Sequence, residues 1–300
     1  MRPPETVLYD APGPRAKRRA LIGTIVAIVG IAALLFVALK RLYDRGQFSM
    51  ELWGPLIDPT NDSFEAVWRL LGRGIIATLT AAVLAIMLAL VIGTVLGVVR
   101  MMLGKWGRIP VVGFIELLRG LPVVITIYFA SRVIPDVGID LSFLPGPTNL
   151  WYLVIGLTAY NMVIIAEIVR AGVASLPRGQ AEAARAVGMT ELQVMGTVLL
   201  PQAFRTMLPA LISQLVVVLK DTSLVALLGG YIELLRRGLI ISQNLDNPIQ
   251  MLFVVGAMFI AINYALSRLA VWTESRLSRS AGGKKAAVKT EEAAGAVAGA

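Results

Sequence analysis

The sequence of 300 residues contains neither cysteine nor histidine. Without cysteine, the chain forms no disulfide and has no thiolate chemistry. Without histidine, it lacks the commonest metal ligand and the commonest general base near neutral pH. These two absences exclude a zinc hydrolase and a Ser-His-Asp enzyme, so we expect neither catalytic residues nor a metal site in this chain.

Charged residues are scarce as well. They make up 16% of the chain, hydrophobic residues make up 57%, and the mean hydropathy is +0.75. This composition lies outside that of ordinary soluble proteins. The net charge of +9 is also found in nucleic-acid-binding proteins, but here the basic residues sit beside apolar runs. That distribution is typical of a membrane protein with basic cytoplasmic edges, so we predict an all-α integral membrane protein.

Six apolar segments are long enough to cross a bilayer core of about 30 Å. The predicted transmembrane helices are 21–39, 75–99, 109–134, 150–173, 201–228 and 251–271. No small-residue cleavage site follows the first, so we interpret it as a retained span rather than a signal peptide. Lys and Arg are roughly twice as numerous on one side of these spans as on the other, which predicts that both termini are cytoplasmic. The predicted regions are a flexible basic tail 1–19, an extra span with an external loop 20–74, a core 75–272 and a flexible tail 273–300.

Charged and polar side chains inside the predicted spans are candidate pathway residues, because a charge at bilayer depth usually faces protein or water. Glu116 and Arg119 are three residues apart, as are Glu167 and Arg170, so each pair lies on one helix face and can pair. Both pairs fall near the cytoplasmic end of a span, where snorkelling to the headgroups is an alternative explanation for Glu116 and Arg119. The candidate pathway or gate residues are Lys220, Asp221, Thr222, Ser223, Glu116, Arg119, Tyr160, Glu167 and Arg170.

Two further local patterns predict packing and loops. Gly93 and Gly97 form a G-x-x-x-G pattern that lets a neighbouring helix approach closely, and packing within one subunit is favoured over a dimer seam. Arg100, Lys105 and Arg108 form a short basic turn, predicted to be cytoplasmic. The polar segment 229–249 is predicted to be an external loop.

The longest polar insertion in the second half of the chain runs from Gln180 to Pro201. An Ala-rich helix over 180–187 is expected to end at Gly188, and Thr190 with Gln193 is expected to cap the next helix before the fifth span begins at Pro201. Glu182 and Arg185 would form a polar rim beside small residues that allow close approach to a partner surface: Ala181, Ala183, Ala184 and Ala186. A DNA-binding helix-turn-helix begins in the same way. Membrane spans on both sides leave no room for such a domain.

Several motifs resemble those of the polar amino-acid branch of ABC importer permeases. Glu182-Ala183-Ala184, Gly188 and Leu200-Pro201 have the spacing of the cytoplasmic coupling loop of these proteins, which would occupy 178–201, although Val198 stands where Ile is more common. Other matching segments are Glu116 to Pro122, Tyr160, Ala166 to Gly172, Gly179-Gln180 and Lys220 to Leu224. The N-terminal stretch 7–15 resembles that of actinobacterial glutamate-uptake permeases, whose members also carry an extra first span.

The resemblance implies a type I ABC importer permease core of five helices preceded by one extra span, in the bacterial plasma membrane. It implies a second membrane subunit, of the same or a different chain, two ATPase subunits that carry ATP-Mg, and an external substrate-binding protein. The implied ATPase-coupling residues are Glu182, Ala183, Ala184, Gly188, Leu200 and Pro201. The sequence contains no G-x-x-x-x-G-K-S/T loop to hold ATP phosphates, so we expect no cofactor on this chain and no nucleic-acid partner.

The expected substrate is glutamate. Lys220 lies about 28 Å beyond Pro201 along an unbroken helix, where its charge can draw in a carboxylate; alternatively, it pairs internally with Asp221 or Glu233. Glutamine, arginine or histidine would suit a permease of the same branch. An ion-coupled secondary carrier remains an alternative, although such carriers often contain two repeated halves and no repeat is apparent here. A structural membrane anchor is a third possibility.

Overall fold

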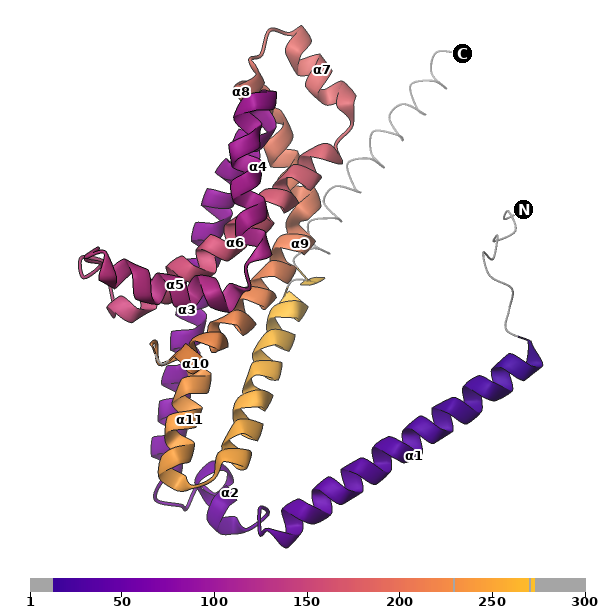
Figure 1. Cartoon of the computed structure of the whole chain (residues 1–300), viewed down its shortest axis with the longest axis vertical. Helices are drawn as coiled ribbons and strands as arrows, with labels where there is room; N and C mark the ends of the chain where they lie inside the picture. The colour runs from indigo at the N-terminus through magenta and orange to yellow at the C-terminus, as the bar shows by residue number, and fades with distance from the viewer. Residues whose placement is uncertain (1–12, 229, 270, 273–300) are drawn as a thin grey trace, which may run out of the picture.

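The computed structural model describes residues 13–228, 230–269 and 271–272, and Figure 1 shows their arrangement. Every regular element in these ranges is a helix. The elements are α1 (Pro14–Asp44), α2 (Met50–Ile57), α3 (Phe64–Met102), α4 (Lys105–Gly120), α5 (Val123–Asp136), α6 (Thr148–Ala174), α7 (Arg178–Ala186), α8 (Glu191–Gln193), a π-helical turn (Val194–Leu199), α9 (Leu200–Asp221), a 3-10 turn (Thr222–Leu224), α10 (Val225–Leu228), α11 (Leu234–Leu245) and a last helix (Pro248–Leu269). The predicted tails over 1–12 and 273–300 lie outside the described residues.

Five helices are long and apolar enough to cross a membrane: α1, α3, α6, the continuous helix Glu191–Leu228 and Pro248–Leu269. The pair α4 and α5 passes the same test together but is bent by 101°. With this pair counted as one span, the prediction of an all-α membrane protein with six spans is confirmed. The prediction of an unbroken span over 109–134 is wrong. Leu121 precedes Pro122 and is therefore pushed out of the helical region, so the chain turns there.

The centre of the bundle is α6, which packs against α3, α5 and α9. Its Leu153, Val154 and Leu157 are buried against small residues of α3. A side chain on Gly93 would place its Cβ 2.5 Å from the Met162 carbonyl oxygen. The G-x-x-x-G pattern is therefore confirmed as a packing seam within one subunit.

The N-terminal end of α3 is more structured than the sequence predicted. The helix begins at Phe64 rather than at residue 75, and the predicted loop 229–249 forms α11. α11 buries Leu234 and Ile241 in a cluster with Leu71 of α3. The loop prediction is wrong because the polar residues of α11 occupy only one face, while its apolar face covers α3.

α1 stands apart from the other helices in Figure 1. It has no buried residue, although residues 21–39 within it are uncharged and strongly apolar. A helix that is apolar all round and touches little protein is suited to lipid on every side. The predicted first span, 21–39, lies within α1. The predicted flexible tail is wrong from Pro14 onward, because proline is tolerated in the first turn of a helix.

Candidate functional site

At one end of the bundle, α7 and α8 form a helical hairpin that projects beyond α6 (Figure 1). Gly188 ends α7 with φ at +86°, in the left-handed region that favours glycine. The Gly188 amide donates to the Arg185 carbonyl at 2.9 Å, and the Met189 amide donates to the Ala184 carbonyl at 3.2 Å. These two bonds form a Schellman motif, so the predicted stop at Gly188 is confirmed.

The second helix of the hairpin is capped as predicted. The Gln193 amide donates to the Thr190 hydroxyl oxygen, and the Thr190 amide donates to the Gln193 side-chain oxygen at 2.8 Å. This reciprocal pair is a capping box. Arg185 forms two hydrogen bonds with the Glu191 carboxylate, at 2.6 and 3.0 Å, and so ties α7 to α8. Arg185 is therefore a clamp across the turn rather than part of a polar rim with Glu182.

The alanines of α7 divide between two faces. Ala184 is buried against Val194 and Met195 of the π-helical turn, and Ala181 packs beside it. The prediction that all four alanines face a partner is therefore wrong for these two. The outward face carries Glu182, Ala183, Ala186, Val187, Gly188 and Leu192.

Two apolar side chains on this outward face were not identified from the sequence. Val187 is 77% exposed and Leu192 is 64% exposed. Exposed apolar side chains grouped with small residues are typical of a protein-protein contact. Both residues lie between residues of the predicted coupling motif. A sequence search for apolar residues in the hairpin that no other hairpin residue covers would identify them.

The hairpin continues without interruption into the membrane. The chain is helical from Glu191 through the π-helical turn to Asp221, so the helix that contains the predicted fifth span begins ten residues before Pro201. Proline clashes with the carbonyl four residues earlier, and the wider π-helical turn just before Pro201 relieves that crowding. Leu200 is half-buried and Pro201 is exposed, and both lie in the first turn of α9, where proline is tolerated.

Behind the hairpin, one carboxylate is shared between two arginines. Glu167 of α6 accepts a hydrogen bond from Arg100 of α3, and its second oxygen accepts one from the Arg170 Nε at 2.8 Å. The i, i+3 pair of Glu167 and Arg170 was predicted. Arg100 was assigned to a cytoplasmic turn, which is wrong, because it lies in the last turn of α3 and is buried. Sequence reasoning missed this partner because it is distant along the chain.

The other predicted pair lies where the chain bends. Glu116 and Arg119, in the last two turns of α4, form an ion pair of 3.2 Å and are both about half exposed. The pairing is confirmed. Its position is at the corner before Pro122 rather than near the end of a straight span.

A buried polar bridge joins α6 to α9. The Gln214 side-chain nitrogen donates to the Asn161 side-chain oxygen at 2.6 Å, and Asn161 donates to the Leu157 carbonyl at 2.8 Å. Asn161 is fully buried and Gln214 nearly so. Tyr160, the predicted pathway residue beside this bridge, is only partly buried. Gln214 was not identified from the sequence.

At its far end, α9 tightens into the 3-10 turn Thr222–Leu224 and continues as α10, within the membrane-depth part of the bundle. Val218 and Leu219 pack in one cluster with Ala81 and Ala85 of α3, which lie inside the uncharged stretch 75–99. The Thr222 hydroxyl donates to the Leu219 carbonyl and the Ser223 hydroxyl to the Lys220 carbonyl, each at 2.7 Å. These predicted pathway residues therefore stabilise the end of the helix, since their hydroxyls bond the last carbonyls.

Lys220 is exposed on α9, and Asp221 beside it is partly buried. In the described part of the chain, Lys220 makes no ion pair. The predicted alternative of pairing with Glu233 is wrong, because Glu233 accepts from the amides of Leu235 and Arg236 and caps α11. The other predicted partner, Asp221, is next to Lys220 in the chain but forms no ion pair with it among the described residues.

A cavity of about 230 Å³ lies between α5, α6 and the segment that follows the 3-10 turn. Its polar lining consists of Ser131, Arg132, Asn149 and Tyr152. The Arg132 guanidinium lies 5.7 Å from the centre of the Tyr128 ring, a cation–π distance. Arg132 was missed because it lies in the part of the predicted third span that reads as apolar. Discontinuous membrane helices often surround a transport site, and here the cavity is lined by α10 and Gly230, which follow the 3-10 turn after α9.

The chain is similar to known transport proteins. Residues 86–279 match the family described as binding-protein-dependent transport system inner membrane component. The chain is 38% identical over 254 residues to the glutamate transport system permease protein GluD of Corynebacterium glutamicum, covering 84% of this chain and 89% of that protein. It is 32% identical over 180 residues to the probable glutamine ABC transporter permease protein GlnP of Bacillus subtilis, covering 57% and 79%.

Solved structures show a similar fold. A crystal structure of an amino acid ABC transporter with histidines has a TM-score of 0.62 and 27% sequence identity, covering 71% of this chain and 97% of that one. An inward-facing structure of the MetNI methionine ABC transporter has a TM-score of 0.61 and 21% identity, covering 71% and 98%.

Proposed function

Because this chain belongs to the family of binding-protein-dependent transport system inner membrane components and is an amino-acid ABC transporter permease, we propose that it imports glutamate using ATP hydrolysed by a separate subunit. In this proposal the chain forms the translocation pathway and binds no cofactor. Its sequence has no phosphate-binding loop of the G-x-x-x-x-G-K-S/T type. ATP-Mg therefore belongs to the partner ATPase.

The observation that carries the coupling role is the rigid, outward-facing hairpin of α7 and α8. Its turn is fixed by the Schellman motif, the capping box and the Arg185–Glu191 clamp. Its outward face offers Glu182, Ala183 and Gly188 together with the exposed Val187 and Leu192. Such a surface is suited to a groove on a partner, since apolar anchors with small neighbours allow close contact.

Movement of the hairpin would be transmitted by a continuous helix. From Glu191 to Asp221 the chain is helical throughout, a length of about 45 Å at 1.5 Å per residue. Ala184 packed on Val194 and Met195 makes α7 move with this helix. Closure of the ATP-bound partners would therefore shift Lys220 and the 3-10 turn beside it. That shift would expose the pathway to each side in turn.

The partners follow from this mechanism. We expect two ATPase subunits beneath the hairpins, a second membrane subunit, of the same or a different chain, and an external substrate-binding protein. Both termini and the hairpin would lie in the cytoplasm, as the distribution of Lys and Arg predicts.

Glutamate is supported by two kinds of observation. Relatives named for glutamate include GluD and the glutamate/aspartate import permease protein GltK of Escherichia coli, which is 32% identical over 166 residues. The structure adds two exposed cations, Lys220 beside the 3-10 turn and Arg132 at the cavity. A side-chain carboxylate would bind such a cation by a charge-assisted hydrogen bond. Glutamine is the second candidate because of its named relative in Bacillus subtilis.

The test is uptake by vesicles that contain the assembled transporter, with ATP supplied inside and ion gradients collapsed. We expect uptake of labelled glutamate that excess unlabelled glutamate abolishes and glutamine reduces only weakly. Stronger competition by glutamine would make glutamine the substrate in place of glutamate, and it would leave the proposed role of the hairpin in ATPase coupling unchanged. In a second assay, with an ion gradient imposed, uptake that continues without ATP but ceases when the gradient is collapsed would instead identify a secondary carrier.

A further inference from the structure

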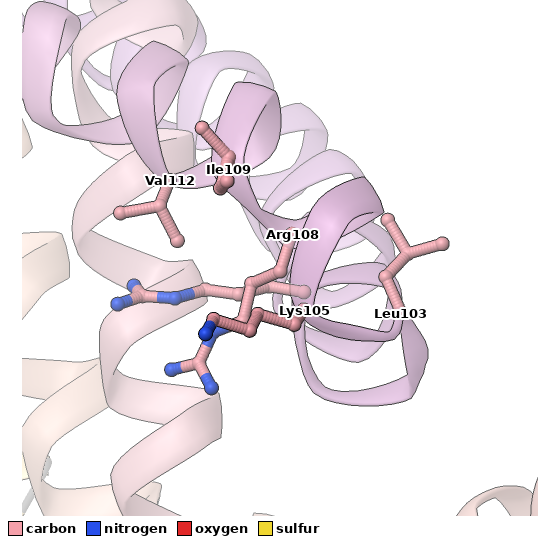
Figure 2. Close-up of a pocket in the computed structure, with 6 residues that line it drawn as sticks. Leu103, Lys105, Arg108, Ile109 and Val112 are labelled. Atoms are coloured by element: carbon pink, nitrogen blue, oxygen red, sulfur yellow. The ribbon is translucent and has the colours of Figure 1, made fainter.

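A larger cavity, of about 520 Å³, opens at the corner between α3 and α4. Three basic side chains line it, Arg100, Lys105 and Arg108, and its remaining wall is apolar, formed by Leu103, Ile109 and Val112. Figure 2 shows the ends of Lys105 and Arg108 reaching the same side of the corner. The cavity takes no part in the coupling or transport roles described above.

Positive charge in this region exceeds the nearby negative charge. Glu167 is shared by Arg100 and Arg170, and Glu116 pairs with Arg119. Arg108 and Arg170 both lie close enough to Arg100 to repel its guanidinium. Within the described ranges, Lys105 and Arg108 form no ion pair. Of the three lining cations, Lys105 and Arg108 are therefore the two that no acidic residue in the described part of the chain pairs with.

Hydrogen-bond donors in the cavity are unused as well. Arg100 is only 9% exposed, and its Nε has no hydrogen-bond partner among the described residues. α4 starts beside it at Lys105, and its N-cap residue, Gly104, contributes no side-chain cap. The first amides of a helix attract an anion when no side chain caps them. A buried guanidinium nitrogen and an open helix start thus favour the same kind of ligand, an anion with several acceptor oxygens.

The surroundings of the cavity indicate a lipid rather than a soluble anion. Ile109 is 57% exposed and Trp106, next to Lys105, is 82% exposed. Tryptophan is enriched at the level of lipid headgroups, and an exposed Trp106 beside the cavity fits a position at that level. An apolar wall beside the cations would contact the glycerol and upper acyl chain of a phospholipid, whereas free phosphate would leave it uncovered.

We propose that this cavity binds the phosphate of an anionic phospholipid, with Lys105 and Arg108 as donors and the buried guanidinium of Arg100 adding positive charge to the wall. Basic pockets between membrane helices are suited to such headgroups. The predicted orientation assigns the lipid to the cytoplasmic leaflet. The binding itself does not depend on which amino acid the transporter carries.

The experiment measures lipid binding to the full-length chain, purified in its assembled complex, by native mass spectrometry with phosphatidylglycerol and phosphatidylcholine. The variant is Lys105→Gln with Arg108→Gln, and Arg100 is left intact because it also holds Glu167. We expect one tightly bound phosphatidylglycerol per chain, bound roughly 30-fold more weakly by the variant, since each basic residue near an anionic lipid surface contributes about fivefold. A second variant, Lys105→Arg with Arg108→Lys, keeps both charges and should bind as the unmodified chain does.

The matched control is Lys17→Gln with Arg18→Gln on α1, which removes one Lys and one Arg from exposed positions outside the cavity. It should weaken binding less than about twofold if the site is local. If the control variant and the cavity variant lost lipid affinity equally, the proposal would be overturned, because any basic residue of the chain would then attract anionic lipid. Equal binding of phosphatidylcholine, or displacement by inorganic phosphate, would overturn the assignment to an anionic lipid. None of these outcomes depends on a transport assay, so failure of the proposed function remains distinguishable.

Discussion

At its Glu191 end, the long helix that becomes α9 is held by a capping box, the Arg185–Glu191 clamp and the buried side chains of Val194 and Met195. At its Asp221 end, the same helix unwinds into a 3-10 turn and the short α10 before the chain breaks. The first end is held by polar contacts across the hairpin as well as by packing, whereas the second packs through Val218 and Leu219 and bonds its last carbonyls with the hydroxyls of Thr222 and Ser223.

This difference fits two separate tasks. An end that receives force from a partner must not bend, because a flexible turn would absorb the movement. An end that borders a pathway must offer polar groups and free backbone, which the membrane tolerates only where protein or a cavity surrounds them. Four variants change one end at a time, and the variant with the largest expected effect comes first.

Gly188→Asp should abolish coupled transport, with ATP-driven uptake lowered about 100-fold, because an unpaired charge at a desolvated contact costs several kcal/mol. Membrane abundance, measured by immunoblot, should remain near that of the unmodified chain. The matched control is Gly46→Asp. Gly46 also has a positive φ, +67°, and a Cβ added there would have open space within 4 Å, but it lies at the opposite end of the bundle. Equal loss of uptake in both variants would show that backbone strain, not the coupling surface, explains the effect.

Lys220→Gln should raise the KM for glutamate about 20-fold, the amount expected when one charge-assisted hydrogen bond to a substrate is lost. ATPase stimulation by the loaded binding protein should keep its maximal rate, because the hairpin is unchanged. Lys220→Arg should retain most of the affinity. Initial uptake rates over a range of glutamate concentrations test this, and an unchanged KM for Lys220→Gln would remove this residue from the pathway.

Glu233→Ala should loosen the chain beyond the break. The Glu233 carboxylate accepts from two amides at 2.7 and 2.8 Å, and the residue is fully buried. Loss of a helix cap lowers the free energy of unfolding by about 1 kcal/mol, which thermal denaturation in detergent would detect. The corresponding cap at the other end, removed by Thr190→Ala, is exposed. We expect a smaller loss of stability there, and the reverse order would contradict the comparison.

Arg185→Gln should have the smallest effect, a decrease of about twofold in the maximal rate of transport with KM unchanged, because exposed ion pairs contribute little. Glu191→Gln should behave in the same way. The exchanged pair, Arg185→Glu with Glu191→Arg, should recover the rate. Additive losses in the exchanged variant would show that the clamp does not hold the hairpin.

Much of the hairpin was predictable because its contacts are local. Gly188, Thr190 and Gln193 act within a few residues of one another, so turn and capping preferences identify them. The outward exposure of Val187 and Leu192 was not predictable, since it depends on how α7 docks on the π-helical turn.

The bend before Pro122 shows the limits of hydropathy. The segment is apolar enough to be taken as one span, and proline is tolerated inside membrane helices, so its presence does not by itself predict a turn of 101°. The amphipathic α11 was missed for a related reason. Its polar face reads as a loop, while its apolar face is defined only by the cluster it shares with α3.

By itself, the sequence determined the membrane class, the number of spans and the shape of the hairpin, because apolar length, charge bias and capping act over short distances along the chain. Only the tertiary structure decided that Arg100 and Arg170 share Glu167, that Lys220 lacks Glu233 as a partner, and that three cations meet at the corner of α3 and α4. These arrangements join side chains from different helices. Helix packing sets their positions, and packing depends on the shapes of both faces rather than on the order of residues in either one.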